Sequence, residues 1–151
     1  MGFSEEILGE FTLPKAEDTQ ALGERIGRSL CGGEVILCFA PMGAGKTCLA
    51  QGIARGLGVN RVVNSPTFNM VKVYRGKPLV FYHVDAYRLE DAKENRDIGL
   101  WDFLKDEEGV VYIEWPEYVL EDLRGIGEAL KVEISIQEYG VRKARISRVT
   151  V

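Results

Sequence analysis

The sequence predicts a single α/β domain over residues 1–151, with central parallel strands, antiparallel hairpin additions and flanking helices. Two short apolar runs, at residues 35–39 and 110–113, have the composition of strands buried on both faces of a sheet. The first run is followed by a glycine-rich loop and a helical pattern, which is the order of a strand–loop–helix unit. Residues 129–137 and 144–151 alternate apolar and polar side chains across a glycine turn, which predicts a hairpin.

The first elements of the chain follow from local patterns. Residues 11–13 predict a short strand. A helix capped by Asp18 or Thr19 carries apolar side chains at every fourth position from Leu22 to Leu30. Two adjacent glycines then end that helix.

The middle of the chain predicts a second helix, a hairpin and shorter helical pieces. The helix is expected over residues 46–57, before a glycine. Residues 68–74 and 79–85 form the two strands of a hairpin around a turn that contains glycine and proline. The polar segment 91–104 has scattered apolar anchors and predicts short helices around Gly99.

The glycine-rich loop matches the P-loop pattern G-x-x-x-x-G-K-[ST] except at its first position. Gly43 and Gly45 allow backbone conformations in which N–H groups converge on a phosphate, and the helix N-terminus faces the same anion. Lys46 is expected to reach the β- and γ-phosphates, and the Thr47 hydroxyl to hold Mg²⁺. The residues expected to bind the nucleotide in this loop are Met42, Gly43, Ala44, Gly45, Lys46, Thr47 and Cys48.

The start of the loop departs from the pattern. Ala40 replaces the first glycine, which a P-loop tolerates because alanine is still small. Pro41 removes one N–H group from a loop that presents N–H groups. The donors nearest the phosphates are expected at residues 43–47, so the loop keeps its function.

Two acidic residues complete the predicted site. Asp85 ends the apolar strand at 79–84, and Glu114 ends the strand at 110–113. Ligands in open α/β sheets bind at the carboxyl ends of strands, so both acids are candidates for Mg²⁺ binding and for positioning the attacking water. The residues alone leave open which acid has which role.

Four further residues have two interpretations each. Thr67 either completes Mg²⁺ coordination or is a turn residue, and His83 is either a proton shuttle or partner of the acids, or a hydrogen-bonded core residue. Arg88 either stabilises charge or, as we favour, pairs with nearby acids. Trp115 is favoured as a core residue over an adenine platform. An Asn-Lys-x-Asp motif is absent from the sequence, so ATP is favoured over GTP.

Charge and cysteine content exclude several classes of protein. From Asp85 to Glu128 the chain carries 14 acidic and 5 basic residues, and no basic cluster resembles a nucleic-acid-binding surface. No signal sequence or membrane-spanning apolar run is present, so a cytoplasmic location is expected. Cys31, Cys38 and Cys48 lack the spacing of a zinc site or a disulfide framework. We expect Cys38 and Cys48 to be small core residues rather than reactive thiols.

Four motifs resemble the TsaE family, in the family's order and spacing, and the likeness spans nearly the whole chain. They are Met42-Gly-Ala-Gly-Lys-Thr47, Ser65-Pro-Thr-Phe68, His83-Val-Asp-Ala-Tyr-Arg-Leu89 and Ile113-Glu-Trp-Pro116. The family usually has Gly-Asp where this chain has Ala40-Pro41, so any role of that aspartate stays open here.

The resemblance implies a small bacterial P-loop ATPase that is required to make threonylcarbamoyladenosine beside the tRNA anticodon. TsaE-like proteins bind the complex of the TsaD transferase with TsaB, and their ATP hydrolysis, weak in isolation, resets that complex. ATP and Mg²⁺ are the implied ligands. The implied partner is this protein complex, with no tight direct contact to nucleic acid and none to a membrane.

The mechanism that we expect is ATP hydrolysis. Residues 43–47 hold the phosphates, Thr47 and Glu114 hold Mg²⁺, and Asp85 orients or activates the attacking water. Lys46 is counted with the two acids as catalytic. Thr67 senses the γ-phosphate, and Trp115 shapes the site beside Glu114.

Two other functions use the same loop. A small-molecule kinase would carry an arginine-rich lid, but the region after Asp85 is rich in acids and has only scattered arginines. A nucleotide-gated binding module with negligible catalysis would not need Asp85 or Glu114. The two acids at strand ends favour the ATPase.

Overall fold

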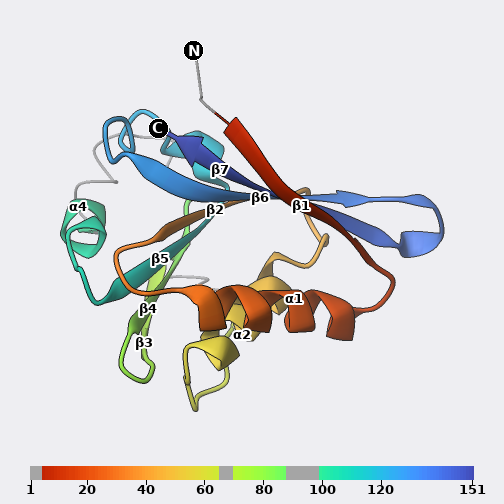
Figure 1. Ribbon diagram of the computed structural model, residues 1–151, viewed down its shortest axis with the longest axis horizontal. Helices are drawn as coiled ribbons and strands as arrows, with labels where there is room; N and C mark the ends of the chain where they lie inside the picture. The colour runs from red at the N-terminus through yellow and green to blue at the C-terminus, as the bar shows by residue number, and fades with distance from the viewer. Residues whose placement is uncertain (1–4, 65–69, 88–98) are drawn as a thin grey trace.

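The computed structural model describes residues 5–64, 70–87 and 99–151, and every structural statement below refers to these residues. Seven strands form one sheet in the order β1-β7-β6-β2-β5-β4-β3 (Figure 1). The strands are β1 (Glu5–Leu13), β2 (Val35–Phe39), β3 (Val71–Arg75), β4 (Val80–Asp85), β5 (Gly109–Glu114), β6 (Glu128–Ile136) and β7 (Arg142–Thr150). The helices are α1 (Ala16–Ser29), α2 (Lys46–Gly56) and α4 (Leu100–Leu104), with 3-10 turns at η1 (Pro116–Tyr118) and η2 (Glu138–Gly140).

The predicted fold class is confirmed by the strand directions. β2 runs parallel to both of its neighbours, β5 and β6, and β4 runs parallel to β5. The hairpins β3–β4 and β6–β7 are antiparallel, and β1 adds an antiparallel edge to β7. β1 is longer than the three-residue strand expected at residues 11–13.

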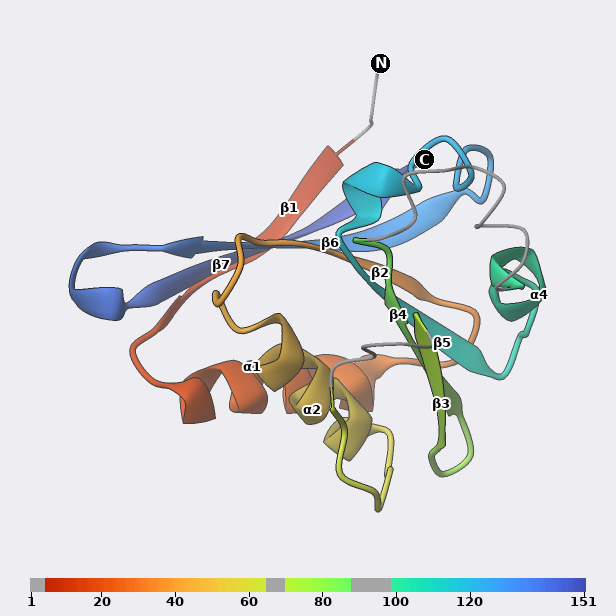
Figure 2. The same cartoon turned by 180° about the vertical axis from the view of Figure 1, so that it is seen from behind.

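The sheet has a hydrophobic core on each face because successive residues of a strand point to opposite sides. Ile36 and Cys38 of β2 pack in the cluster that contains the buried residues of α1 and α2. Val35 and Leu37 of the same strand pack in a second cluster, with Leu100 of α4. Figures 1 and 2 show α1 and α2 together on one face of the sheet. None of the helices in the described parts of the chain has the length and apolar character needed to cross a membrane.

Helix α1 begins earlier than the sequence predicted. Its first residue is Ala16, after Lys15, so neither Asp18 nor Thr19 is the N-cap. Asp18 lies in the first turn, and its carboxylate accepts a hydrogen bond from the Lys15 N–H group at 2.9 Å. The acid therefore satisfies a free N–H group at the helix N-terminus from inside the helix, as the second half of a capping box does.

Helices α1 and α2 approach each other so closely that glycine is required at their contact. A Cβ atom at Gly52 would lie 2.1 Å from the backbone oxygen of Gln20, and one at Gly27 would lie 2.3 Å from that of Ile53. No side chain can be accommodated at these distances without moving a helix backbone. Close packing on α1 therefore fixes the position of α2, whose first residue, Lys46, directly follows the glycine-rich loop.

We predict that Gly52→Ala destabilises the protein although alanine is the better helix former. Helix propensity favours alanine by about 1 kcal/mol, whereas overpacking costs about 1–3 kcal/mol. We expect the free energy of unfolding in urea to fall by about 1–2 kcal/mol. Ala21→Gly on the exposed side of α1 is the control, because it reports helix propensity alone. A Gly52→Ala protein more stable than the parent would contradict the close packing.

Candidate active site

The predicted loop and both predicted acids meet at one edge of the sheet. The loop leaves the carboxyl end of β2, and the ends of β5 and β4 bring Glu114 and Asp85 beside it, opposite each other in the parallel register. A cavity of about 330 Å³ lies between them. The lining residues are Met42, Gly43, Gly45, Lys46, Thr47, Cys48, Asp85, Glu114 and Trp115.

Most of the sequence-predicted residues therefore lie around this cavity. Ala44 does not line it, because its side chain is fully buried in the core below the loop. Thr67 and Arg88 lie outside the described residues. Cys38 is a core residue as expected, and burial raises the pKa of its thiol to about 12. Cys48 is only partly buried and faces the cavity, in contrast to the expected core position.

Backbone conformation accounts for the two glycines of the loop. Gly43 has φ +76° and Gly45 has φ +109°, both in the left-handed region that side chains disfavour. A Cβ atom at Gly43 would meet no atom within 4 Å, so the constraint there is the dihedral angle and not crowding. Gly45 is the N-cap of α2, and the helix starts with Lys46 directly beside the cavity. Free N–H groups at the first turn of α2 can bind an anion here.

Pro41 supports the loop through its carbonyl oxygen. This oxygen accepts a hydrogen bond from the Ala44 N–H group at 3.2 Å and another from Lys46 Nζ at 3.2 Å. The turn therefore does not depend on the N–H group that proline lacks. The departure from the P-loop pattern at this position is compatible with an intact loop.

Lys46 is held between the loop and an aromatic ring. Its Nζ atom donates to the carbonyl oxygens of Ala40 at 2.8 Å and Pro41, and lies 3.7 Å from the centre of the Trp115 ring. The residue is only 7% exposed, and loss of water lowers the pKa of the amine from its ordinary value. A phosphate bound in the cavity would give this ammonium group an oppositely charged partner, which a charge removed from water needs.

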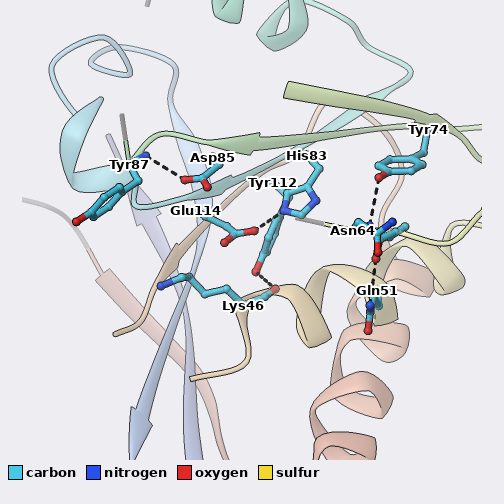
Figure 3. Close-up of polar contacts among 10 residues, drawn as sticks. Lys46, Gln51, Asn64, Tyr74, His83, Asp85, Tyr87, Tyr112 and Glu114 are labelled. Carbon is cyan, nitrogen blue, oxygen red and sulfur yellow. Dashed lines mark hydrogen bonds and ion pairs between the residues drawn. The ribbon is translucent and has the colours of Figure 1, made fainter. Parts of the chain in front are cut away.

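Glu114 is fixed from behind by a buried histidine. It is 4% exposed, and one carboxylate oxygen is hydrogen-bonded to Nε2 of His83, a residue that is fully buried (Figure 3). When the Glu114 carboxyl group is ionised, Nε2 is the donor of this hydrogen bond, because a carboxylate has no hydrogen to donate. Tyr112 packs edge-on against the His83 ring and donates its hydroxyl hydrogen to the Lys46 carbonyl at 2.8 Å. His83 is therefore a hydrogen-bonded core residue, as one interpretation expected, and its partner is one of the two acids, as the other expected.

Asp85 is more accessible than Glu114. It is partly buried, and Oδ1 accepts a hydrogen bond from the Tyr87 N–H group at 3.0 Å. Burial raises the pKa of its carboxyl group, and the nearby charge of Glu114 adds to the effect. In Figure 3, Asp85, Glu114 and Lys46 come together at the end of the sheet. The two acids thus differ in environment, because Glu114 is hydrogen-bonded to His83 and Asp85 lies nearer to solvent.

Trp115 lies at the wall of the cavity rather than in the core. Its backbone is left-handed, with φ 56° and ψ 50°, which is unusual for an aromatic residue. This turn places the ring over Lys46 and 5.1 Å from the ring of Tyr87. The predicted role beside Glu114 fits this position.

One residue at the loop was not found by sequence reasoning. Arg142, the first residue of β7, donates hydrogen bonds to the carbonyl oxygens of Ala44 at 3.3 Å and Gly43 at 3.1 Å. It lies about a hundred positions along the chain from the loop. The basic residues of this C-terminal segment, Arg142, Lys143, Arg145 and Arg148, predict from sequence a solvated strand face or edge. No local pattern separates it from the other arginines of that strand.

The residues present fit a magnesium ion that is shared with a phosphate. Thr47, Asp85 and Glu114 bring hydroxyl and carboxylate oxygens to one cavity, and Mg²⁺ prefers oxygen ligands. Within the described residues, no group of three or more His, Cys, Asp or Glu side chains could hold a metal by itself. This is the donor set expected where substrate phosphates and water complete the coordination of Mg²⁺.

Parallel central strands, with a glycine-rich loop between β2 and α2 that faces acids at the ends of β5 and β4, define a P-loop-like α/β domain. The sequence model of the threonylcarbamoyl adenosine biosynthesis protein TsaE matches residues 13–146, and the chain belongs to the TsaE family.

Individual relatives agree with this assignment. A protein of Mycobacterium tuberculosis (strain ATCC 25618 / H37Rv), named tRNA threonylcarbamoyladenosine biosynthesis protein TsaE, is 39% identical over 147 residues, covering 92% of this chain and 80% of its own. The protein of the same name from Treponema pallidum (strain Nichols) is 41% identical over 108 residues, covering 72% of this chain and 78% of its own. The crystal structure of YdiB from Bacillus subtilis superposes with a TM-score of 0.76 at 27% identity, covering 100% of this chain and 88% of the other.

Proposed function

We propose that this protein binds and hydrolyses ATP with Mg²⁺ as a component of tRNA threonylcarbamoyladenosine biosynthesis. We further propose that it acts on a TsaB–TsaD-like complex rather than on tRNA directly. The observation that carries the proposal is the convergence of the P-loop, Lys46 and two strand-end acids on one cavity. Membership in the TsaE family supports the pathway.

Some residues around the cavity bind the phosphates and Mg²⁺, and another positions the attacking water. N–H groups of the loop and of the α2 N-terminus bind the phosphates, and Lys46 Nζ exchanges its contacts with loop carbonyls for phosphate oxygens. Thr47 and Glu114 would hold Mg²⁺, which when bound neutralises phosphate charge. Asp85, the more accessible acid, orients the attacking water.

Burial strengthens each of these interactions. Lys46 and Glu114 are almost completely removed from water, so their charges are weakly screened. His83 holds the Glu114 carboxylate in place before any ligand arrives. The site is thus organised in advance of binding, which is the main source of electrostatic catalysis.

A protein partner fits this chain better than direct binding of tRNA. The segment from Asp85 to Glu128 carries a large excess of acidic residues, which disfavours binding of a phosphate backbone. The basic residues Arg145 and Arg148 of β7 are paired with Glu10 and Glu6 of β1. Their charges are therefore already matched within the protein.

The test measures phosphate release from ATP by the purified protein, alone and with the TsaB and TsaD proteins of the same organism. We expect weak release alone and clear stimulation by the complex, and recovery of TsaB and TsaD by the tagged protein in only one nucleotide state. Absence of hydrolysis in both mixtures would contradict the proposal. A phosphorylated metabolite in place of free phosphate would instead indicate a kinase.

A further inference from the structure

Arg142 connects the phosphate-binding loop to the β6–β7 hairpin. Its guanidinium group donates to the carbonyl oxygens of Gly43 at 3.1 Å and Ala44 at 3.3 Å, and also to that of Gly140 at the hairpin tip. One side chain therefore bonds to two successive loop peptides and to η2. Figures 1 and 2 show this hairpin extending past the helices at the side of the sheet away from β3.

These contacts fix the direction of the N–H group of Gly45, a residue that lines the cavity. In a trans peptide the carbonyl oxygen and the following N–H group point in opposite directions. Because the Ala44 oxygen points to Arg142, the Gly45 N–H group points away from it, and Gly45 lines the cavity. The Gly43 oxygen likewise fixes the Ala44 N–H group, which donates to Pro41 within the turn.

The other arginines of β7 do not share this arrangement. Arg145 donates to Glu10, and Arg148 donates to Glu6, so both bind carboxylates of β1. Both glycines of the loop have positive φ values, which glycine adopts readily but does not prefer, so local conformation alone does not fix the orientation of the loop peptides. A guanidinium group suits this task, since it presents several N–H donors in a rigid fork.

We propose that Arg142 is a positioning residue of the active site, which holds the loop peptides in the orientation that binds phosphate. This inference rests on the proposed binding of ATP. Arg142 acts through the loop backbone and not by contact with the nucleotide. Its fork geometry is required, so a lysine at this position does not replace it.

The first experiment measures the dissociation constant of a fluorescent ADP analogue for Arg142→Ala, Arg142→Lys and Arg145→Ala proteins. We expect both Arg142 variants to bind about tenfold more weakly, the size expected for losing charge-assisted hydrogen bonds. Arg145→Ala removes the same charge from the same strand and should bind like the parent. Parent-like affinity of Arg142→Ala would overturn the proposal, and so would parent-like affinity of Arg142→Lys, which would leave charge alone as the cause.

The second experiment needs no nucleotide. Hydrogen exchange of peptides covering residues 40–49 is compared between the parent, Arg142→Ala and Arg145→Ala proteins. We expect faster exchange only in Arg142→Ala, with unchanged exchange in β2 and α2 cores showing that the fold is intact. Equal exchange in all three proteins would overturn the support of the loop by Arg142. If the parent itself binds no nucleotide, the proposed function fails, but this measurement still decides the role of Arg142 in the loop.

Discussion

Replacing Lys46 by methionine is expected to reduce partner-stimulated ATP hydrolysis by about a hundredfold or more, as removal of one preorganised donor does in other enzymes. Lys46 is the cation whose Nζ atom lies beside the P-loop carbonyls and the Trp115 ring at the cavity. Methionine keeps an unbranched stem in the space that the lysine stem occupies, so packing is largely preserved. The change therefore isolates the loss of the charge.

The measurement is the rate of phosphate release at saturating TsaB and TsaD, with Lys143→Met as the matched control. Lys143 lies on the exposed β6–β7 hairpin, pairs with Glu10 and does not line the candidate active-site cavity. Thermal unfolding of both variants shows whether the fold is retained. A Lys46→Met protein that is folded and hydrolyses ATP at the parent rate would exclude the P-loop as the hydrolytic site.

The main parts of the fold and the cavity could be predicted because their signals are local. The run at 35–39, the glycines at 43 and 45, and Lys46 are contiguous, and each has one dominant physical reason for its position. Asp85 and Glu114 needed one further rule, that parallel strands bring their carboxyl ends to the same edge. The observed register places these two acids directly opposite each other.

Contacts between distant segments could not be predicted in this way. His83 lies two residues before Asp85 on β4 and so on the same strand face, but its hydrogen bond is to Glu114 on the neighbouring strand. That pairing depends on strand order and on burial, which the sequence alone does not determine. Arg142 was grouped with the basic residues of a strand, because only the three-dimensional position of the hairpin tip brings it to the loop.

The start of α1 shows a different limit. The sequence offered Asp18 and Thr19 as N-caps because both residue types favour that position. Asp18 instead accepts from the Lys15 N–H group across one turn, so the helix gains three residues at its start. Cap preference and capping-box geometry place the same acid at different positions, and the structure has the capping box.

Replacing the two strand-end acids one at a time is expected to show that one acid binds the metal and the other positions the attacking water. Glu114→Gln should raise the Mg²⁺ concentration needed for half-maximal hydrolysis by about tenfold or more. Loss of even an outer partner of a metal ligand lowers metal affinity by about 10–100-fold. Asp85→Asn should lower the maximal rate by about a hundredfold or more without a change in the Mg²⁺ requirement. Both changes preserve side-chain size and remove one charge.

The opposite assignment predicts the reverse pattern, so the experiment can decide between the two roles. Among the residues that the structure describes, the Glu114 carboxylate is hydrogen-bonded through one oxygen to His83, so its other oxygen can bind a metal. Asp85 has the exposure that a water-positioning group needs. Glu108→Gln is the charge-matched control and should behave like the parent. Glu108 is exposed and directly precedes β5, at the opposite end of the strand from Glu114. If both acid variants keep the parent rate while retaining nucleotide-dependent partner binding, the protein is a nucleotide-gated binding module. The assignment of the two acids to hydrolysis is then overturned, because neither acid at the cavity would contribute to catalysis.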